Sequence, residues 1–172
     1  MSAEQALVDV QALDARIAIH GPAPAGDAVR AAWVDALASA DAGPPDADVA
    51  VACDVDGRPD LADLSTRVTL AAIEHGRRRL TMIHACAVAG SDGAVAAFVG
   101  PSGAGKTTMA RALAAYAGYV TDETVAVTSE GTVLPYRKPL SLVRPDGPKE
   151  QVAPGSLGLL TLPPVPLRLV SL

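Results

Sequence analysis

Residues 82–107 read MIHACAVAGSDGAVAAFVGPSGAGKT, and this stretch decides the fold. Two short apolar runs, 82–89 and 94–99, flank the turn-forming letters GSDG at 90–93. Apolar runs joined in this way predict the two antiparallel strands of a β-hairpin. The second strand enters a glycine-rich loop, and the loop enters the amphipathic run TTMARALAAYA at 107–117. We therefore predict a strand, a loop and a helix in direct succession.

The loop GPSGAGKT at 100–107 fits the P-loop (Walker A) pattern G-x-x-x-x-G-K-[ST] at every defined position. Its glycines lack the β-carbons that would keep the loop from wrapping a phosphate, and its backbone N–H groups can point at the anion. Lys106 can reach the terminal phosphates, and the Thr107 hydroxyl can bind Mg²⁺. The predicted nucleotide-binding residues are Gly100, Pro101, Ser102, Gly103, Ala104, Gly105, Lys106, Thr107 and Thr108.

Gly118 is the predicted C-terminal cap of the helix that follows the loop. A short predicted strand at 119–121 comes next, and an acidic pair, Asp122 and Glu123, follows it. A carboxylate there can reach Mg²⁺ beside Thr107 or accept the proton of an attacking hydroxyl. We expect one carboxylate of Asp122 and Glu123 to hold the metal, with Asp122 assigned there, and the other to act as the base. A solvated acidic turn is the alternative.

The residues before the hairpin predict further strands and helices. Loose alternation predicts a strand over 12–19, and residues 48–55 predict another. A helix capped by Asp27 would place Val29, Trp33 and Leu37 on one face, with Trp33 in the core. A longer helix would be capped by Asp63 or Ser65, carry Leu64, Val68 and Ala71 or Ala72 on its apolar face, and end near Arg79.

After the acidic pair, TVAV and TVLP flank Ser129-Glu130-Gly131 and predict a second hairpin. The tail from Arg144 is rich in Pro and Gly, with a strand candidate at 167–172. We expect one α/β domain over 1–172, with a mixed parallel and antiparallel sheet. Residues 1–80 would add elements to that sheet, 81–143 would form the P-loop core, and 144–172 the tail.

Composition limits the classes of partner. The chain has 172 residues, a net charge of −5 and 3% aromatic residues, which argues against a nucleic-acid partner. No apolar run approaches a membrane span, and the start has no export signal, so we expect a cytoplasmic protein that binds no membrane. Cys53 and Cys86 are expected to be buried reduced thiols.

The run from His84 through the loop to GYVTDETVAV resembles the HPr kinase/phosphorylase family, which is related to the phosphoenolpyruvate carboxykinases. In that family a hairpin containing a His precedes the P-loop, and an acidic pair follows the loop helix. The resemblance covers about a third of the chain, from Ile83 to about Leu142. It implies an ATP- and Mg²⁺-dependent phosphotransferase, with His84 near the reacting phosphates and Asp122 as the catalytic aspartate. It also implies self-association as a homo-oligomer.

Two departures from the family are visible. Glu123 stands where the family usually has a second Asp, and the chain has only a short Pro-rich tail where the family carries further elements with an arginine-containing segment. The expected function is transfer of the ATP γ-phosphate to a hydroxyl of a protein, peptide or small molecule. The alternative is a catalytically inactive, nucleotide-dependent switch or assembly protein. A P-loop GTPase lacks support, because no N-K-x-D-like segment follows the loop.

The remaining charged residues carry weaker expectations. Arg137 and Lys138 either neutralise a transferred phosphate or form a solvated surface pair. The run 77–79 of three arginines is expected to complement the C-terminal end of a helix. His20 and His75 have no companions for a metal site and receive no role.

Overall fold

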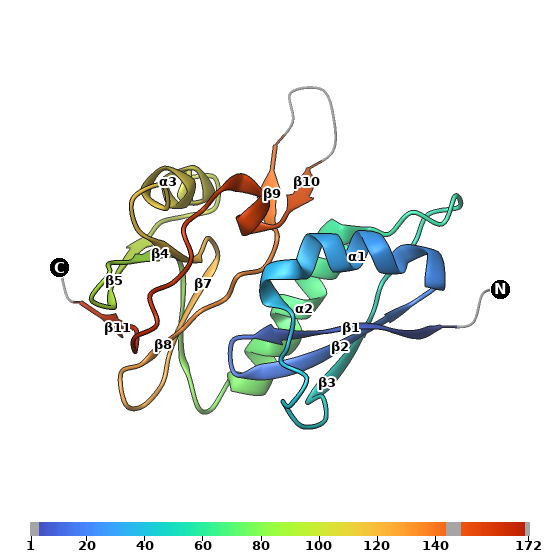
Figure 1. Ribbon diagram of the computed structural model, residues 1–172, viewed down its shortest axis with the longest axis horizontal. Helices are drawn as coiled ribbons and strands as arrows, with labels where there is room; N and C mark the ends of the chain where they lie inside the picture. Colours follow the sequence, from blue (N-terminus) through green and yellow to red (C-terminus); the bar gives the residue numbers. More distant parts are fainter. Residues whose placement is uncertain (1–3, 144–148, 171–172) are drawn as a thin grey trace.

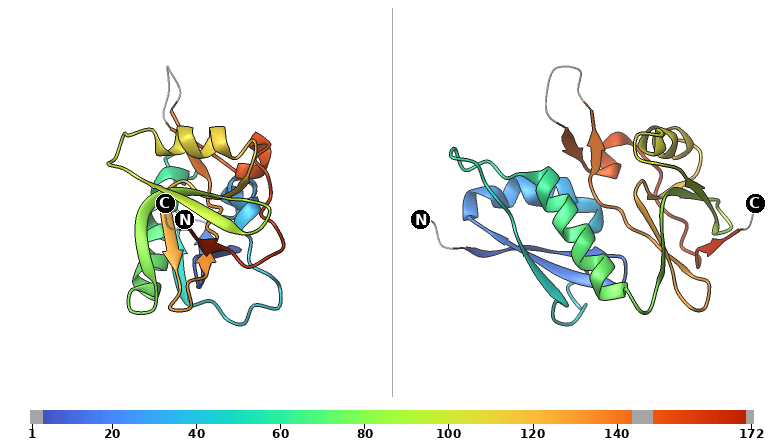
Figure 2. Two further views of the ribbon diagram at one scale, coloured as in Figure 1. Left: turned by 90° about the vertical axis from the view of Figure 1, so that its left-hand side faces the viewer. Right: turned by 180° about the vertical axis from the view of Figure 1, so that it is seen from behind.

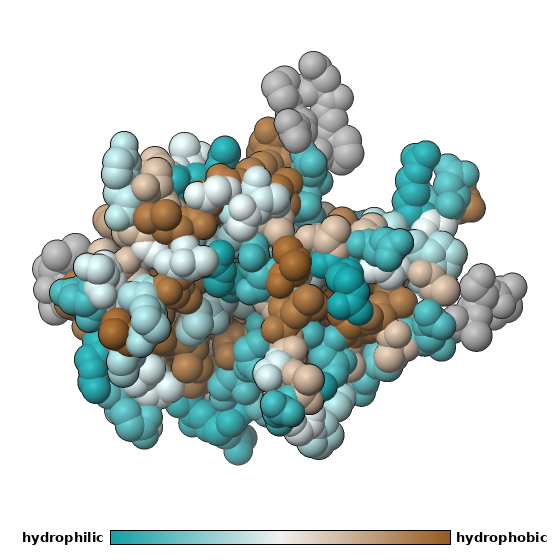
Figure 3. Space-filling model, in the orientation of Figure 1, coloured by the Kyte–Doolittle hydropathy of each residue, from teal (hydrophilic) through white to brown (hydrophobic). Residues whose placement is uncertain are grey.

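The computed structural model describes residues 4–143 and 149–170, and it has a mixed α/β fold with parallel and antiparallel strands. This confirms the predicted fold class at that level. The N-terminal strands lie at one end of the molecule and the glycine-rich loop with its helix at the other (Figure 1). None of the helices within the described ranges has the length and apolarity required to cross a bilayer. On the face shown in Figure 3, apolar residues gather near the middle and hydrophilic residues cover most of the lower edge.

The N-terminal sheet has the strand order β1 (Gln5–Ala12), β2 (Ala15–Gly21), β3 (Ala47–Ala50). β1 and β2 pair antiparallel, and β3 runs parallel to β2. The strand predicted over 12–19 is confirmed from Ala15 onward as part of β2, but its start is wrong, because the chain turns at Leu13, whose φ is 56°. β3 is also shorter than the predicted 48–55.

Two helices form the core with this sheet. Trp33 in α1 (Gly26–Trp33) is fully buried with Val29, which confirms the predicted apolar face, whereas Leu37 lies beyond the helix. Short 3₁₀ turns, Ala23–Ala25 and Val34–Ala36, flank α1. Asp27 does not cap α1: the N-cap is Ala25, and Asp27 lies in the first turn, because the preceding 3₁₀ turn continues directly into the helix.

The second helix, α2 (Leu61–Gly76), begins earlier than predicted. Its N-cap is Asp60, whose carboxylate accepts hydrogen bonds from two backbone amides, so Asp63 and Ser65 both lie inside the helix. The helix ends at Gly76, before the arginines at 77–79. Leu64, Val68 and Ala72 are buried as predicted, whereas Ala71 is only partly buried.

The larger sheet has the order β11-β5-β4-β7-β8, and β6 also pairs with β4. The predicted hairpin is confirmed, since β4 and β5 pair antiparallel around the turn at 90–93, and the second hairpin, β7 with β8, is confirmed as well. The bounds are β4 (Thr81–Ala89), β5 (Ala94–Val99), β6 (Gly118–Thr121), β7 (Thr124–Val127), β8 (Val133–Leu134) and β11 (Arg168–Leu169).

Residues 1–80 do not add strands to this sheet, which corrects the expectation of one shared sheet. β1 to β3 form a sheet of their own, because α1 and α2 cover its apolar side. The molecule thus has two halves, the N-terminal sheet with α1 and α2, and the larger sheet with the helix after the glycine-rich loop. They meet through Ala126 of β7 and Tyr136 in the segment after β8, because both residues belong to the N-terminal core.

The helix after the glycine-rich loop, α3 (Lys106–Leu113), packs on the larger sheet in a cluster that includes Cys86, Ala110 and Tyr119. It ends at Leu113 with Ala114 as the C-cap, so the predicted capping by Gly118 is wrong. Gly118 instead begins β6, where a β-carbon would lie 3.0 Å from the carbonyl oxygen of Thr161. The glycine therefore permits close approach of the C-terminal segment.

The C-terminal segment contains structure that its composition does not predict. β9 (Leu140–Leu142) and β10 (Glu150–Val152) form an antiparallel pair, and a 3₁₀ turn follows at Pro154–Leu157. The chain then crosses to the far edge of the larger sheet, where β11 runs parallel to β5 (Figure 2). Of the strand predicted at 167–172, residues 168–169 are confirmed as β11, and residues 171–172 lie outside the described residues.

Candidate functional site

The glycine-rich loop lies between β5 and the start of α3, as the sequence predicts. Gly103 and Gly105 adopt φ values of 81° and 85°, which side-chain-bearing residues rarely adopt, and Gly105 is the N-cap of α3. The Lys106 ammonium folds back over the loop and donates hydrogen bonds to the carbonyl oxygens of Gly100 and Pro101, at 2.7 and 2.9 Å. An exposed loop, a helix N-terminus and a lysine thus meet at one point, a combination suited to holding an anion.

Asp122 follows β6 directly and reaches the start of α3. Its Oδ2 accepts a hydrogen bond from the Thr107 hydroxyl at 2.9 Å, and its Oδ1 accepts one from the Tyr119 hydroxyl at 3.1 Å. The Asp122 residue is only 5% exposed. The predicted proximity of Asp122 and Thr107 is therefore present in the fold.

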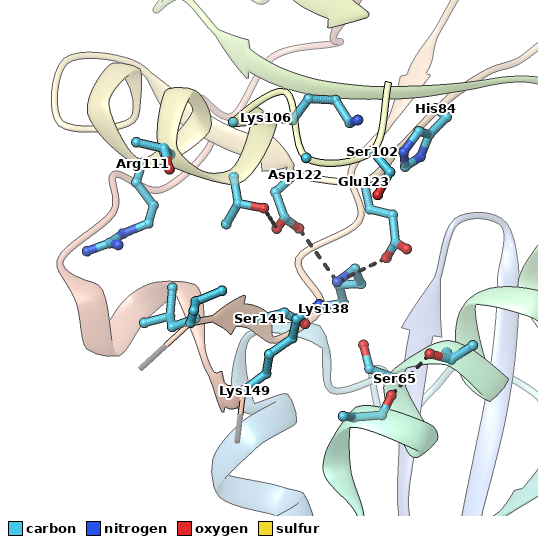
Figure 4. Close-up of a pocket in the computed structure, with 18 residues that line it drawn as sticks. Ser65, His84, Ser102, Lys106, Arg111, Asp122, Glu123, Lys138, Ser141 and Lys149 are labelled. Carbon is cyan, nitrogen blue, oxygen red and sulfur yellow. Dashed lines mark hydrogen bonds and ion pairs between the residues drawn. The ribbon is translucent and has the colours of Figure 1, made fainter. Parts of the chain in front are cut away.

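Lys138 joins the two predicted carboxylates. Its ammonium lies 3.0 Å from Oε2 of Glu123 and 3.6 Å from Oδ1 of Asp122 (Figure 4). It also donates a hydrogen bond to the carbonyl oxygen of Pro139. Because Lys138 is 3% exposed, the solvated surface pair considered from the sequence is wrong for this residue. Its neighbour Arg137 lies outside the cluster, with its guanidinium over the ring of Tyr119.

These groups border a cleft of about 480 Å³ between the glycine-rich loop, the first turns of α2 and the β9–β10 pair. His84, Asp122 and Glu123 all line it, so the fold brings the three predicted catalytic residues together. Of the predicted nucleotide-binding residues, Gly100, Pro101 and Ala104 lie outside its lining; those that line it are Ser102, Gly103, Gly105, Lys106, Thr107 and Thr108.

Burial keeps two groups near the acidic pair in their neutral forms. Burial, the negative charge of Asp122 and the hydrogen bond to that carboxylate raise the pKa of Tyr119 well above its usual value, so its hydroxyl remains a donor to Asp122. Burial also raises the pKa of the Cys86 thiol on β4. Cys86 is buried as expected, whereas Cys53 is only partly buried; both thiols are free.

Thr107 and Asp122 are the residues best suited to a metal. No cluster of three or more His, Cys, Asp or Glu side chains suitable for a metal occurs within residues 4–143 and 149–170. Mg²⁺ commonly takes only one or two protein oxygens and completes its shell with water and phosphate. The Thr107 hydroxyl and the Asp122 carboxylate, with their oxygens 2.9 Å apart beside the loop, fit that requirement.

Several lining residues were absent from the predicted site. Ser65 and Thr66 come from α2, Arg111 from α3, and Ser141 and Lys149 from the β9–β10 region. None of them belongs to a local motif. Ser65, Thr66, Ser141 and Lys149 reach the cleft because α2 and the β9–β10 region face the loop in the folded chain, whereas Arg111 reaches it from the helix that follows the loop. Figure 4 shows Arg111 and Lys149 on the side opposite His84.

The fold and the cleft define a mixed α/β protein with a glycine-rich loop beside a lysine-bridged pair of carboxylates. Comparisons with protein-family models, with curated proteins and with solved structures gave no match to this chain.

Proposed function

We propose that this chain binds MgATP in the cleft and transfers its γ-phosphate to a hydroxyl group, as an HPr kinase-like phosphotransferase. The observation that carries the proposal is the 2.9 Å hydrogen bond between Thr107 and Asp122 at the base of the glycine-rich loop. It brings a hydroxyl and a buried carboxylate together where the sequence motif expects the metal and the phosphates. Neither group needs to move far to serve a nucleotide.

Each residue has a distinct task in the proposed reaction. Backbone N–H groups of the loop and Lys106 would hold the phosphates, and Mg²⁺, held by Thr107 and Asp122, would neutralise their charge. The acceptor oxygen forms a bond to the γ-phosphorus while the bond from phosphorus to the β–γ bridging oxygen breaks, and ADP leaves with that electron pair. The acceptor's proton passes to Glu123, the carboxylate that does not hold the metal.

Calorimetric titration of MgATP into the intact chain tests the proposal. Lys106→Ala should lower the affinity about tenfold or more, because a charge-assisted hydrogen bond to phosphate is lost. Arg77→Ala is the control, since the Arg77 side chain is 72% exposed and pairs only locally with Glu74. A parallel titration of MgGTP compares the affinity for guanine nucleotide with that for adenine nucleotide. Absence of ATP binding by the intact chain would contradict the proposal.

A second candidate is a nucleotide-dependent switch or assembly protein without transfer activity. The observation in its favour is that Lys138 already forms ion pairs with both carboxylates. This candidate predicts ATP binding without ADP formation in the presence of any hydroxyl acceptor. It also predicts that Asp122→Asn spares partner binding more than Lys106→Ala does.

A further inference from the structure

A second hollow opens beside the proposed reaction cleft. It has a volume of about 340 Å³, lies between α2 and β4, and shares Thr66, His84 and Glu123 with the cleft. In the view from behind, α2 ends at a turn from which β4 rises, and the two elements diverge from that turn (Figure 2). Most of the remaining lining is aliphatic, from Leu70, Ile73, Met82 and Ile83. An apolar surface therefore continues directly to His84 and Glu123 of the site.

Along this hollow, strand β4 has an open edge. Residues Ala85–Ala89 are buried between β5 on one side and β6 with Glu123 on the other. Residues Thr81–His84 pair with β7, which continues the β6 side, but β5 ends at Val99 opposite Ala85. Within residues 4–143 and 149–170 no strand pairs with Thr81–His84 on the β5 side.

The exposure pattern agrees with this pairing. Thr81 and His84 are exposed and Met82 is partly buried, whereas every residue of Ala85–Ala89 is buried. Strand edges of this kind accept an extended peptide as an added strand, which supplies main-chain hydrogen bonds while pockets select alternate side chains. Since side chains alternate between the faces, Met82 and His84 point to the same face of β4.

We propose that the phosphate acceptor is an extended peptide segment that adds to β4 along Thr81–His84. An aliphatic side chain of the peptide occupies the hollow against Leu70 and Met82. Its Ser or Thr, two positions away and therefore about 6.6 Å along the strand, lies beside His84, which also lines the reaction cleft. This inference rests on the proposed function for the transfer step, and peptide binding to the edge can be measured without it.

The test uses nine-residue peptides with one central Ser in an Ala/Lys background and a single Leu moved from three positions before the Ser to three positions after it. Transfer of labelled phosphate from MgATP should be at least about tenfold faster with Leu two positions from the Ser, on one side or the other, than with Leu adjacent to it. Amide NMR signals of Leu70, Met82 and His84 should shift on adding that peptide. Leu70→Asp should remove both effects while ATP binding, measured by calorimetry, stays unchanged.

Controls make each outcome decisive. Val34→Asp, at another exposed aliphatic residue, should alter neither transfer nor the shifts, and Leu70→Ala gives a milder second variant. Equal rates for all Leu positions, or equal behaviour of Leu70→Asp and Val34→Asp, would overturn the inference. So would preferred transfer to a small alcohol such as glycerol. If ATP does not bind but the peptide still shifts Met82, the peptide site stands and the kinase proposal fails.

Discussion

A buried lysine needs partners that replace the water it loses on folding. Lys138 has two carboxylates and one carbonyl oxygen around its ammonium, and its side chain is 4% exposed. The carboxylates belong to Asp122 and Glu123, of which Glu123 has a side chain still 39% exposed. Lys138 therefore offsets one of the two negative charges of the acidic pair, while Glu123 remains in contact with the cleft.

Replacing Lys138 with Met should lower the free energy of unfolding by about 2–3 kcal/mol, somewhat below the usual cost of breaking a buried ion pair because Glu123 keeps some water. Urea denaturation measures the change. The control is Arg137→Met, an adjacent cation that is only partly buried. It lies over the Tyr119 ring and donates two long hydrogen bonds, to the carbonyl oxygens of Tyr119 and Leu160, so we expect a cost of about 1 kcal/mol. Equal costs for the two variants would show that Lys138 is not held by the carboxylates.

Among single residues of the site, the sequence predicts those that belong to one local motif. The loop glycines, Lys106 and Thr107 follow from a pattern of eight consecutive residues, and Asp122 follows from the short strand after the loop helix. Lys138 could not be assigned, because RKP in a loop reads equally as a solvated pair. Its burial depends on how the segment after β8 passes Asp122, which no local pattern encodes.

The start of α2 shows how one side chain sets the limit of an element. Asp60 accepts hydrogen bonds from the backbone amides of Ala62 and Asp63, at 3.1 and 2.9 Å. These amides lie in the first turn, where no helical carbonyl can reach them. Because α2 contributes Ala62, Ser65 and Thr66 to the cleft, the cap also fixes one wall of the site.

Asp60→Ala should therefore destabilise the protein by about 1 kcal/mol, the usual cost of losing an N-cap. Asp60→Asn retains an acceptor oxygen and should recover most of that loss. Asp27→Ala is the control: Asp27 lies in the first turn of α1 without capping it, so only a few tenths of a kcal/mol are expected from the helix dipole. The urea midpoints of the three variants give the order of their stabilities. A larger loss for Asp27→Ala than for Asp60→Ala would contradict it.

The hairpins show why some elements are predictable. GSDG between two apolar runs gives both strands and their pairing, and SEG does the same for β7 and β8. The hairpin of β1 and β2 carries no such signal, because its turn uses Leu13 at positive φ, a conformation that bulky residues rarely adopt. The β9–β10 pair joins strands of three residues each, which are too short to show an alternation of apolar and polar residues in the sequence.

The two halves of the molecule are joined through buried side chains. The hydroxyl of Tyr136, in the segment after β8, shares a 2.8 Å hydrogen bond with Oγ1 of Thr69 on α2. At another point the Asp35 carboxylate accepts a hydrogen bond from the backbone N–H of Gly155. Separate sheets could not be predicted, because these contacts join residues that are 67 and 120 positions apart.

Two buried tyrosines make the stability of the whole molecule sensitive to alkali. Tyr119 and Tyr136 are both fully buried, and burial is the largest cause that raises the pKa of each hydroxyl above its ordinary value. Above about pH 10 the unfolded chain releases two phenolic protons that the folded chain retains. The stabilisation is thus complete below about pH 10 and falls as pH rises further, by about 1.4 kcal/mol per pH unit for each tyrosine.

Alkaline titration of Tyr116→Phe, which removes the third and 90% exposed tyrosine, should show tyrosinate absorbance only where circular dichroism reports unfolding. Adding Tyr136→Phe should lower the slope of stability against pH above about pH 10 by the contribution of one tyrosine, because the unfolded chain then has one phenol fewer to ionise. Thr69→Val removes the partner of Tyr136 and leaves the phenol in place, so it should lower stability at neutral pH and keep the steeper slope. Tyrosinate absorbance that rises before any loss of circular dichroism would mean that a buried phenol, Tyr119 or Tyr136, ionises within the folded chain, and it would contradict the prediction.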